Sequence, residues 1–154
     1  MSNTKEISYC ALYCGNCFIR GGAVADLSQK LLDDFEKVNF EAWAEGLAEI
    51  SPEMKAFSHC KECLEVLKAW DNMRCNHSCK DGGGSSGCRI RECCSKKGLN
   101  GCWECDRYPS CEALDWLKPV NGEINRNNIE LILKEGTEAF IAKMKKQKYS
   151  AFHQ

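Results

Sequence analysis

Cysteine is the residue that most constrains this chain. Thirteen of its 154 residues are cysteine, roughly 8%, which is far above ordinary usage. Six of the thirteen form C-x2-C pairs, the short spacing that lets two thiolates bind one metal ion at tetrahedral angles. One such pair is a weak signal, but three with further cysteines nearby indicate metal binding. The pairs are Cys14 with Cys17, Cys60 with Cys63, and Cys102 with Cys105.

Disulfide bonds could also use this many cysteines, and the expected compartment decides between the two chemistries. The stretch MSNTKEISYCALYCGNCF has no apolar run behind a basic region, so no secretory signal is visible. No segment approaches the roughly 20 consecutive apolar residues that a membrane span needs. We therefore expect a cytoplasmic protein with reduced, metal-binding thiols, and the odd number of cysteines agrees with this expectation.

The apolar content indicates that burial alone does not hold the fold together. Hydrophobic residues make up 44% of the chain, but without cysteine roughly 36% remains, which is low for a domain that offsets chain entropy by burial. Apolar residues recur at helical spacing, and no alternating pattern of strand length occurs. The sequence predicts a small metal-stapled single domain over residues 1–154, mainly α with irregular cysteine-rich loops and little or no β-sheet.

The motifs divide this domain into parts. Residues 1–23 contain the first thiol cluster, 24–58 are helical, 59–118 form the cysteine-rich metal-binding part, and 125–147 form a C-terminal helix. In the helical part, Asn39 is a candidate N-cap for a second helix, so the sequence predicts either two short helices or one bent helix.

Three short helices and a loop are expected within the cysteine-rich part. The loop is DGGGSSG, residues 81–87, which has the composition of a flexible linker. The tryptophans at positions 43, 70, 103 and 116 are expected in the core or over metal sites. The predicted helices are 61–70, 89–97 with Gly98 as C-cap, and 111–117 between Ser110 as N-cap and Pro119 as stop, while Asn125 caps the C-terminal helix.

Zinc is the metal that these thiols favour. Zn²⁺ takes four sulfur or nitrogen ligands, and closed sites of four thiolates are usually structural. Twelve cysteines would fill three sites, although two sites with several free thiols also fit. Cys94 is the spare thiol, whose replacement by serine should change little, because adjacent residues in a helix point about 100° apart. The expected ligands are Cys10, Cys14, Cys17, Cys60, Cys63, Cys75, Cys79, Cys88, Cys93, Cys102, Cys105 and Cys111.

The spacing suggests some groups of ligands but leaves the pairing open. The run from Cys60 to Cys79 could form one finger-like site, and the run from Cys88 to Cys111 contains enough thiols for another. The three N-terminal cysteines then need a fourth ligand from far along the chain. His59 and His77 adjoin cysteines and could replace a thiol, but thiols are abundant and solvated histidines are favoured.

Other chemistries use the same residues. An iron-sulfur cluster is the main alternative, and zinc is favoured because the clustered C-x2-C-x2-C run of ferredoxins is absent. A thiol-redox protein and a metal carrier with an open site also stay open. The stretch YCALYCGNCF has the C-x3-C-x2-C spacing of radical-SAM enzymes, but this chain has neither the length nor the strands for their barrel. No cysteine stands apart with a base beside it, so an enzyme is not favoured.

The order of the motifs resembles a known family. YCALYCGNC, CKEC, CRIREC, CWEC and YPSCEAL are similar to the pattern of small cysteine-rich prokaryotic proteins catalogued as domain of unknown function 3795. The resemblance covers about residues 9–117 and implies a zinc-binding domain with no assigned activity. It supports all the expected ligands except Cys75 and Cys79, which rest on spacing.

Two positions depart from the family pattern. The family commonly has Cys-Gly where this chain has Cys10 followed by Ala11. It also has a cysteine directly after proline, whereas Ser110 precedes Cys111 here. The second shift puts the role of Cys111 in question.

The charge bears on possible partners. The net charge is -1 with neutral thiols, and three four-thiolate zinc sites would lower it to about -7. Bulk charge of this sign does not favour nucleic acid. The lysines near the C-terminus suit a helix end, where they complement the helix dipole. We expect a structural metal-binding domain that presents a surface to a protein partner and binds neither nucleic acid nor membranes.

Overall fold

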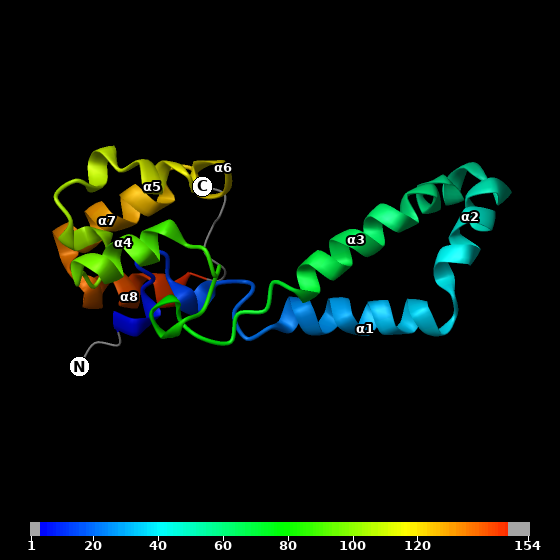
Figure 1. The fold of residues 1–154 in the computed structure, drawn as a ribbon, viewed down its shortest axis with the longest axis horizontal. Coiled ribbons are helices and arrows are strands. Elements are labelled where there is room, and N and C mark those ends of the chain that lie inside the picture. Colours follow the sequence, from blue (N-terminus) through cyan, green and yellow to red (C-terminus); the bar gives the residue numbers. More distant parts are fainter. Residues whose placement is uncertain (1–3, 148–154) are drawn as a thin grey trace. The chain divides into compact units, whose positions relative to one another are not determined.

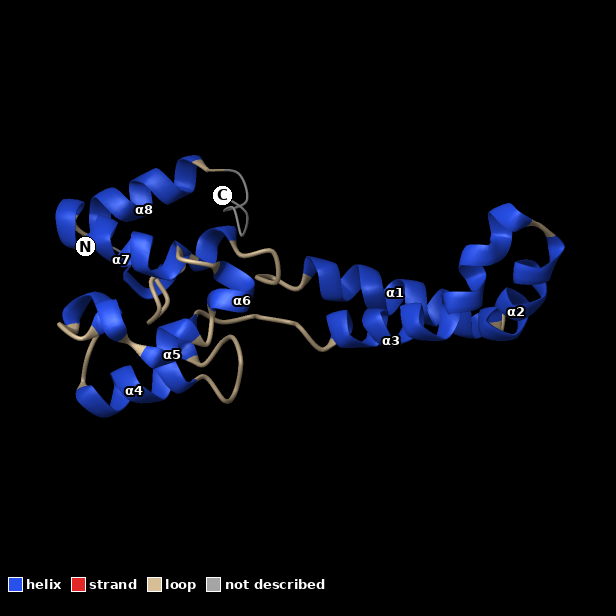
Figure 2. Cartoon of the chain, turned by 90° about the horizontal axis from the view of Figure 1, so that it is seen from above, coloured by secondary structure: helices blue, strands red, loops and turns tan. Residues whose placement is uncertain are grey.

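Helices dominate the structure (Figures 1 and 2). The computed structural model describes residues 4–147, and this part of the chain contains no strand, only two isolated β-bridges. None of its helices combines the length and apolar character needed to cross a membrane. The prediction of a mainly α fold is confirmed. The α-helices are α1 (Ala23–Lys37), α2 (Phe40–Ile50), α3 (Cys60–Asp71), α4 (Arg89–Lys97), α5 (Glu112–Asp115), α6 (Lys118–Asn121), α7 (Ile124–Glu135) and α8 (Thr137–Lys146).

The chain forms two compact units. Unit 1 combines Met1–Arg20 with Cys75–Gln154, and unit 2 is the stretch Gly21–Arg74, which contains α1, α2 and α3. Within unit 1, a parallel bridge joins Arg20 to Cys75, and the Cys75 N–H donates to the Ile19 carbonyl at 3.3 Å. The chain therefore leaves unit 1 and returns to it at adjacent points. The single domain that the length suggests stays a prediction.

The main apolar core of the described residues lies in unit 1. Its side chains come from the N-terminal segment, from α4, α5, α7 and α8, and from Cys102 between α4 and α5, so the core joins the two separate stretches of this unit. The largest of these side chains that are fully buried are Phe140, Ile7, Ile90, Leu114, Ile129 and Cys94.

The C-terminal part forms two helices rather than the single helix predicted for 125–147. Gly136 separates α7 from α8, with φ 86° and ψ 163°. Glycine adopts this non-helical conformation without the steric cost that a side chain would add. Buried apolar residues continue on both sides of the break, at Ile132 and Phe140, and for this reason the periodicity alone suggested one helix. Asn125 lies inside α7 and does not cap it.

Other helix boundaries follow the sequence closely. The helices α3 and α4 confirm the predictions at 61–70 and 89–97, and Gly98 adopts the left-handed C-cap conformation with φ 67°. Two separate helices, α1 and α2, confirm the first of the two alternatives for the helical part. Asn39 between them is left-handed, with φ 49°, and its side chain makes no capping hydrogen bond.

The helix predicted at 111–117 is wrong in its boundaries. The structure has the short helices α5 and α6 in this region, and Cys111 rather than Ser110 occupies the N-cap position of α5. Pro119 lies in the first turn of α6 instead of following a helix. Proline is tolerated there because an N–H in the first turn has no intrahelical acceptor.

Unit 2 buries few apolar side chains. The helices α1 and α3 pack together and run in opposite directions (Figure 1), and α2 packs against the 3₁₀ segment η3 (Pro52–His59). The Phe35 and Phe40 rings stack with centroids 4.5 Å apart, and the Phe57 ring meets Phe40 edge-on. In this unit, all of which is described, the buried apolar residues are Ala25, Ala44, Cys60 and Leu67.

Three of the four tryptophans are exposed, contrary to expectation. The exposed fractions are 68% for Trp43, 45% for Trp70 and 49% for Trp116. Trp103 is half-buried, and its ring lies so close to Gly101 that a Cβ added there would be 2.1 Å from it. The tryptophans other than Trp103 therefore belong to the surface.

Candidate metal centre

The cysteines are divided unevenly between the units. Unit 2 contains Cys60 and Cys63, in the first turn of α3, and unit 1 contains the other eleven. All thirteen are free thiols. The finger-like group predicted from Cys60 to Cys79 has members in both units and stays a prediction.

The two C-x2-C pairs of unit 1 share one local geometry. Each forms a 3₁₀ turn, η2 (Cys14–Asn16) or η5 (Cys102–Glu104), in which the N–H of the second cysteine donates to the carbonyl of the first, at 3.2 and 3.1 Å. Each turn also needs a glycine, because a Cβ on Gly15 or Gly101 would lie 2.6 or 2.1 Å from the nearest aromatic ring. Turns this tight are compact enough for both thiols to reach one ion.

Five cysteines line one cavity of about 340 Å³ in unit 1. They come from α4, from the η5 turn and the residue after it, and from the N-cap of α5. Lys97 and Arg107 also line the cavity, and nearby cations favour the thiolate form of cysteine. The five are Cys93, Cys94, Cys102, Cys105 and Cys111. Cys111, whose role the sequence left in question, is thus brought beside the other thiols.

Cys94 and Cys102 are in contact within this cavity. Both are buried, and their Sγ atoms are 3.9 Å apart. The hydrogen bond between the two thiols is the largest cause that raises the pKa of Cys102 and lowers that of Cys94. Sequence reasoning set Cys94 aside as a spare thiol. Its i,i+4 spacing from Ile90, on the buried face of α4, is the signal that could have identified it.

A second group of thiols gathers around Cys79. Burial raises the pKa of the Cys14 and Cys79 thiols, and the backbone of Cys79 beside Cys14 and that of Tyr9 beside Cys79 oppose this rise. Burial raises the pKa of Cys10 to about 11, and the neighbouring Cys79 and Cys88 thiols also raise it. The N-terminal thiols therefore lie beside cysteines from the second stretch of unit 1.

Three asparagines hold the loop that carries Cys10. The Asn125 amide donates to the Cys10 carbonyl at 2.7 Å, and the Asn128 amide donates to the Ala11 carbonyl at 2.9 Å. Asn121 donates to Asn125 Oδ1 at 3.1 Å, and both of these asparagines are buried. Ala11 is left-handed, with φ 64°, a conformation that glycine adopts without the cost an L side chain adds. Ala11, which stands where the family commonly has glycine, thus occupies a position whose backbone conformation favours glycine.

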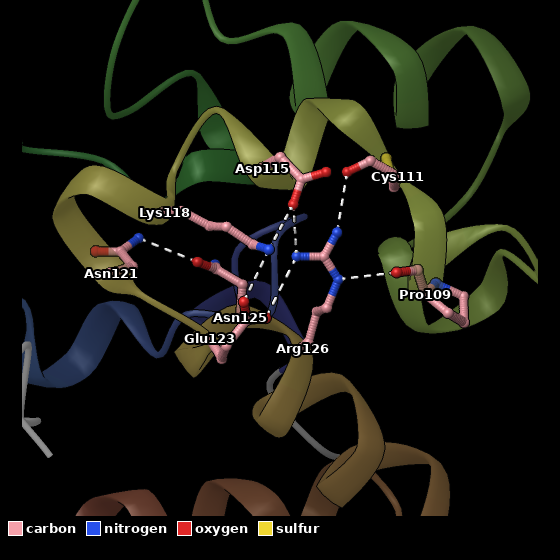
Figure 3. Close-up of polar contacts among 8 residues, drawn as sticks. All are labelled: Pro109, Cys111, Asp115, Lys118, Asn121, Glu123, Asn125 and Arg126. Carbon is pink, nitrogen blue, oxygen red and sulfur yellow. Dashed lines mark hydrogen bonds and ion pairs between the residues drawn. The ribbon is translucent and has the colours of Figure 1, made fainter.

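Arg126 on α7 fixes the loop that carries Cys111 (Figure 3). Its Nε donates to the Pro109 carbonyl at 3.1 Å, and its Nη2 donates to the Cys111 carbonyl at 3.2 Å. Its Nη1 pairs with the Asp115 carboxylate at 3.0 Å, and the Arg126 side chain is only 14% exposed. Sequence reasoning missed Arg126, because bonds to backbone carbonyls leave no spacing pattern.

The glycine-rich loop at 81–87, which the sequence predicts to be a flexible loop, makes polar and packing contacts with neighbouring segments. Arg91 on α4 donates to three carbonyls of this loop, including that of Gly83 at 2.5 Å. A Cβ on Gly83 would lie 1.9 Å from the His77 carbonyl oxygen. The loop therefore packs closely on the segment before it and holds the spacing between Cys79 and Cys88.

These thiols are gathered without forming a complete ligand set. Among residues 4–147, no group of three or more cysteine, histidine, aspartate or glutamate side chains is arranged to hold a metal ion. His59 and His77 are exposed. The choice between zinc and an iron-sulfur cluster, and the number of metal ions, stay predictions.

Comparison with known proteins gives one match. A family model described as "Protein of unknown function (DUF3795)" matches residues 6–116, a stretch that contains all thirteen cysteines. No curated protein and no solved structure matches the chain. The match agrees with the resemblance seen in the motifs and assigns no activity to them.

Proposed function

The chain belongs to the DUF3795 family, and we propose that it is a non-enzymatic zinc-binding protein whose metal ions hold unit 1 together. The observation that carries the proposal is the convergence of five thiols from three segments on one cavity. Free thiols in this number suit a reducing compartment, so we also propose that the protein acts in the cytoplasm. Its role would be to present a stable surface to a protein partner.

The contact between Cys94 and Cys102 supports zinc. Zinc–sulfur bonds of 2.3 Å at tetrahedral angles place neighbouring sulfurs about 3.8 Å apart, and these two Sγ atoms are 3.9 Å apart. We therefore propose Cys94 as a ligand with Cys102, in place of the adjacent Cys93 that the sequence favoured. Rotation of the Cys105 and Cys111 side chains, which line the same cavity, would complete the set.

The charges around the cavity support the same assignment. Four thiolates and one Zn²⁺ carry a net charge of about -2, and Lys97 and Arg107 line the cavity. Burial disfavours thiolates in the absence of metal, but zinc displaces the thiol protons when it binds. Zinc affinity should therefore fall as the solution becomes more acidic.

The group around Cys79 is the second proposed site. Its members are Cys10, Cys14, Cys79 and Cys88, with Cys17 in the same turn as Cys14. Backbone N–H groups of Cys79 and Tyr9 lie beside the sulfurs of Cys14 and Cys79, respectively, and lower the pKa of these thiols against the effect of burial. Such donors stabilise thiolates and orient metal ligands. Two sites in unit 1 would correspond to two zinc ions per chain.

Metal analysis of protein purified without oxygen tests this function. We expect a colourless protein with two zinc ions per chain. Cys105→Ser should lose about one of them, whereas Cys63→Ser, a matched change in unit 2, should keep both. A brown protein that contains iron and sulfide would show that the thiols bind an iron-sulfur cluster and not zinc. A metal-free protein, or equal metal losses in the two variants, would also contradict the proposal.

The adjacent pair on α4 gives a finer test. Cys94→Ser should lose the same zinc ion as Cys105→Ser, and Cys93→Ser should retain it. The opposite result would restore the ligand that the sequence favoured and make Cys94 the spare thiol.

A further inference from the structure

Unit 2 exposes two apolar stripes on neighbouring helices. On α1, residues 27 and 31 are one turn apart, and residue 38, the C-cap just beyond the helix, follows two turns later on the same side. On α3, residues 66 and 70 are related in the same way, and residue 73 continues the stripe beyond the helix end. All six side chains are at least 40% exposed. We name them the α1/α3 apolar face: Leu27, Leu31, Val38, Val66, Trp70 and Met73.

The two stripes lie on one side of the helix pair. Leu27 directly precedes the buried Ser28, and Val66 directly precedes the buried Leu67. Each exposed residue is thus rotated about 100° from the packed face of its helix, in the same sense. Because α1 and α3 run in opposite directions (Figure 1), the same rotation brings both stripes to the same side. The result is a continuous two-helix surface rather than scattered exposed residues.

A face of this kind is typical of an interaction site. Single exposed apolar side chains are common, but contiguous apolar patches mark interaction surfaces. Two neighbouring helices with an exposed apolar seam suit the binding of a third amphipathic helix, which would supply the apolar side chains that the seam lacks.

The negative charge of unit 2 indicates which kind of partner this face would bind. Residues 21–74 contain eleven Asp and Glu against six Lys and Arg, a net charge of -5. The exposed Glu62 lies one turn before Val66 on α3. On α1, Asp34 lies between Leu31 and Val38 and pairs with Lys37 at 2.8 Å, so the acidic character comes mainly from the unit as a whole. A second copy of this acidic face would be repelled, and so would an anionic membrane surface. We propose that the α1/α3 apolar face binds a basic amphipathic helix of a partner protein.

Model peptides and the full-length, metal-loaded protein test this proposal. The probe is a helical peptide of about 18 residues, with leucines at helical spacing and lysines elsewhere, and its matched control has glutamate in place of lysine. The lysine peptide should bind and shift the NMR signals of α1 and α3, and its affinity should fall as salt rises. The glutamate peptide should bind at least about tenfold more weakly.

Surface variants locate the binding site. Leu27→Ser and Trp70→Ser should each weaken binding of the lysine peptide about tenfold. Leu133→Ser is the matched control, because Leu133 is an exposed leucine on α7 of unit 1, at 54% exposure against 70% for Leu27. It should change the affinity less than about twofold. All three residues are exposed, so folding should be preserved, and circular dichroism and metal content check this.

Four results would overturn the proposal. Equal affinity for the two peptides would show that charge does not select the partner. A loss of affinity in Leu133→Ser equal to that in Leu27→Ser would show that the peptide does not bind specifically at the α1/α3 apolar face. A dimer that Leu27→Ser dissociates would assign the face to a second copy, and tight binding to phosphatidylserine vesicles would assign it to a membrane. The zinc content reports separately on unit 1, so failure here leaves the metal proposal intact.

Discussion

The two units use their apolar residues in opposite ways. In the described part of unit 1, twelve apolar side chains form a buried core, whereas unit 2 buries four. Nine of the thirteen large apolar side chains exposed among the described residues belong to unit 2. Helical spacing of apolar residues occurs in both units, so the same sequence pattern produces a core in one and a surface in the other.

Long-range polar contacts account for much of this difference. In unit 1, buried amides and Arg126 tie the N-terminal and Cys111 loops to α7. The ion pairs within unit 2 join exposed side chains, and exposed pairs contribute little to stability. Unit 1 is therefore cross-connected around its thiols, and unit 2 is a lightly packed set of helices.

Removing the metal should produce the largest difference in stability between the two units. Each structural zinc ion contributes on the order of 10 kcal/mol to folding. A chelator under reducing conditions should therefore abolish amide-exchange protection in α4 and α7, with a much smaller change in α1 and α3. Hydrogen exchange followed by mass spectrometry measures this. Equal loss in all four helices would show that the two units unfold together as the single domain suggested by the chain length.

Truncating one large aromatic side chain in each unit should show the next largest contrast. Phe140→Ala opens a cavity in the core of unit 1 and should lower the free energy of unfolding by about 3–5 kcal/mol. Trp43→Ala removes an exposed ring from α2 and should change it by less than about 0.5 kcal/mol. Denaturant titration measures both. A similar cost for the two variants would mean that Trp43 is covered in solution.

The asparagines of α7 test the polar contacts at a single helix. Asn125→Ala leaves the part-buried Cys10 carbonyl and the amide of the buried Asn121 without their partner, which should cost about 1–3 kcal/mol. Asn127→Ala, two positions away on an exposed side, should cost only a few tenths of a kcal/mol. The same denaturant titration compares them, and equal costs would remove the proposed role of Asn125 in holding the Cys10 loop.

Among residues 4–147, each unit contains one left-handed residue other than glycine, Ala11 in unit 1 and Asn39 in unit 2, and replacing them should produce the smallest contrast. The left-handed conformation costs alanine about 1–2 kcal/mol, while losing the buried methyl group costs about 0.8 kcal/mol. Ala11→Gly should therefore stabilise the protein by up to about 1 kcal/mol. Asn39→Gly should have little effect, because asparagine tolerates this conformation. Thermal unfolding of the two variants beside the unmodified protein measures both effects. Destabilisation by Ala11→Gly would show that the lost methyl contact outweighs the relief of the left-handed conformation.

Much of the fold could be predicted from local patterns. The apolar spacing and the Gly98 cap located α1 to α4, because these signals act within a few residues. The break at Gly136 escaped notice because the apolar pattern continues across it. The exposure of Leu27 could not be predicted either, since periodicity identifies an apolar stripe but not what covers it.

The candidate site was predictable in composition but not in arrangement. The spacing of the cysteines identified the residues that gather in unit 1, but it assigned Cys94 to no site and grouped Cys79 with Cys60. Neither the Cys94 contact with Cys102 nor the Cys79 contact with Cys14 follows from spacing, because both depend on how distant segments pack. Arg126 and Asn125 act on backbone carbonyls, which any residue provides.

The pairing of Arg20 with Cys75 bears on how freely the segment between them can vary in length. It makes unit 2 an insertion of more than fifty residues whose two ends meet at one point. The entropy of closing a loop grows only with the logarithm of its length, so exchanging this insertion for a four-residue turn would change the closure cost by only about 2 kcal/mol. The insertion could therefore lengthen, shorten or be replaced while the thiol-bearing scaffold that flanks it stays the same.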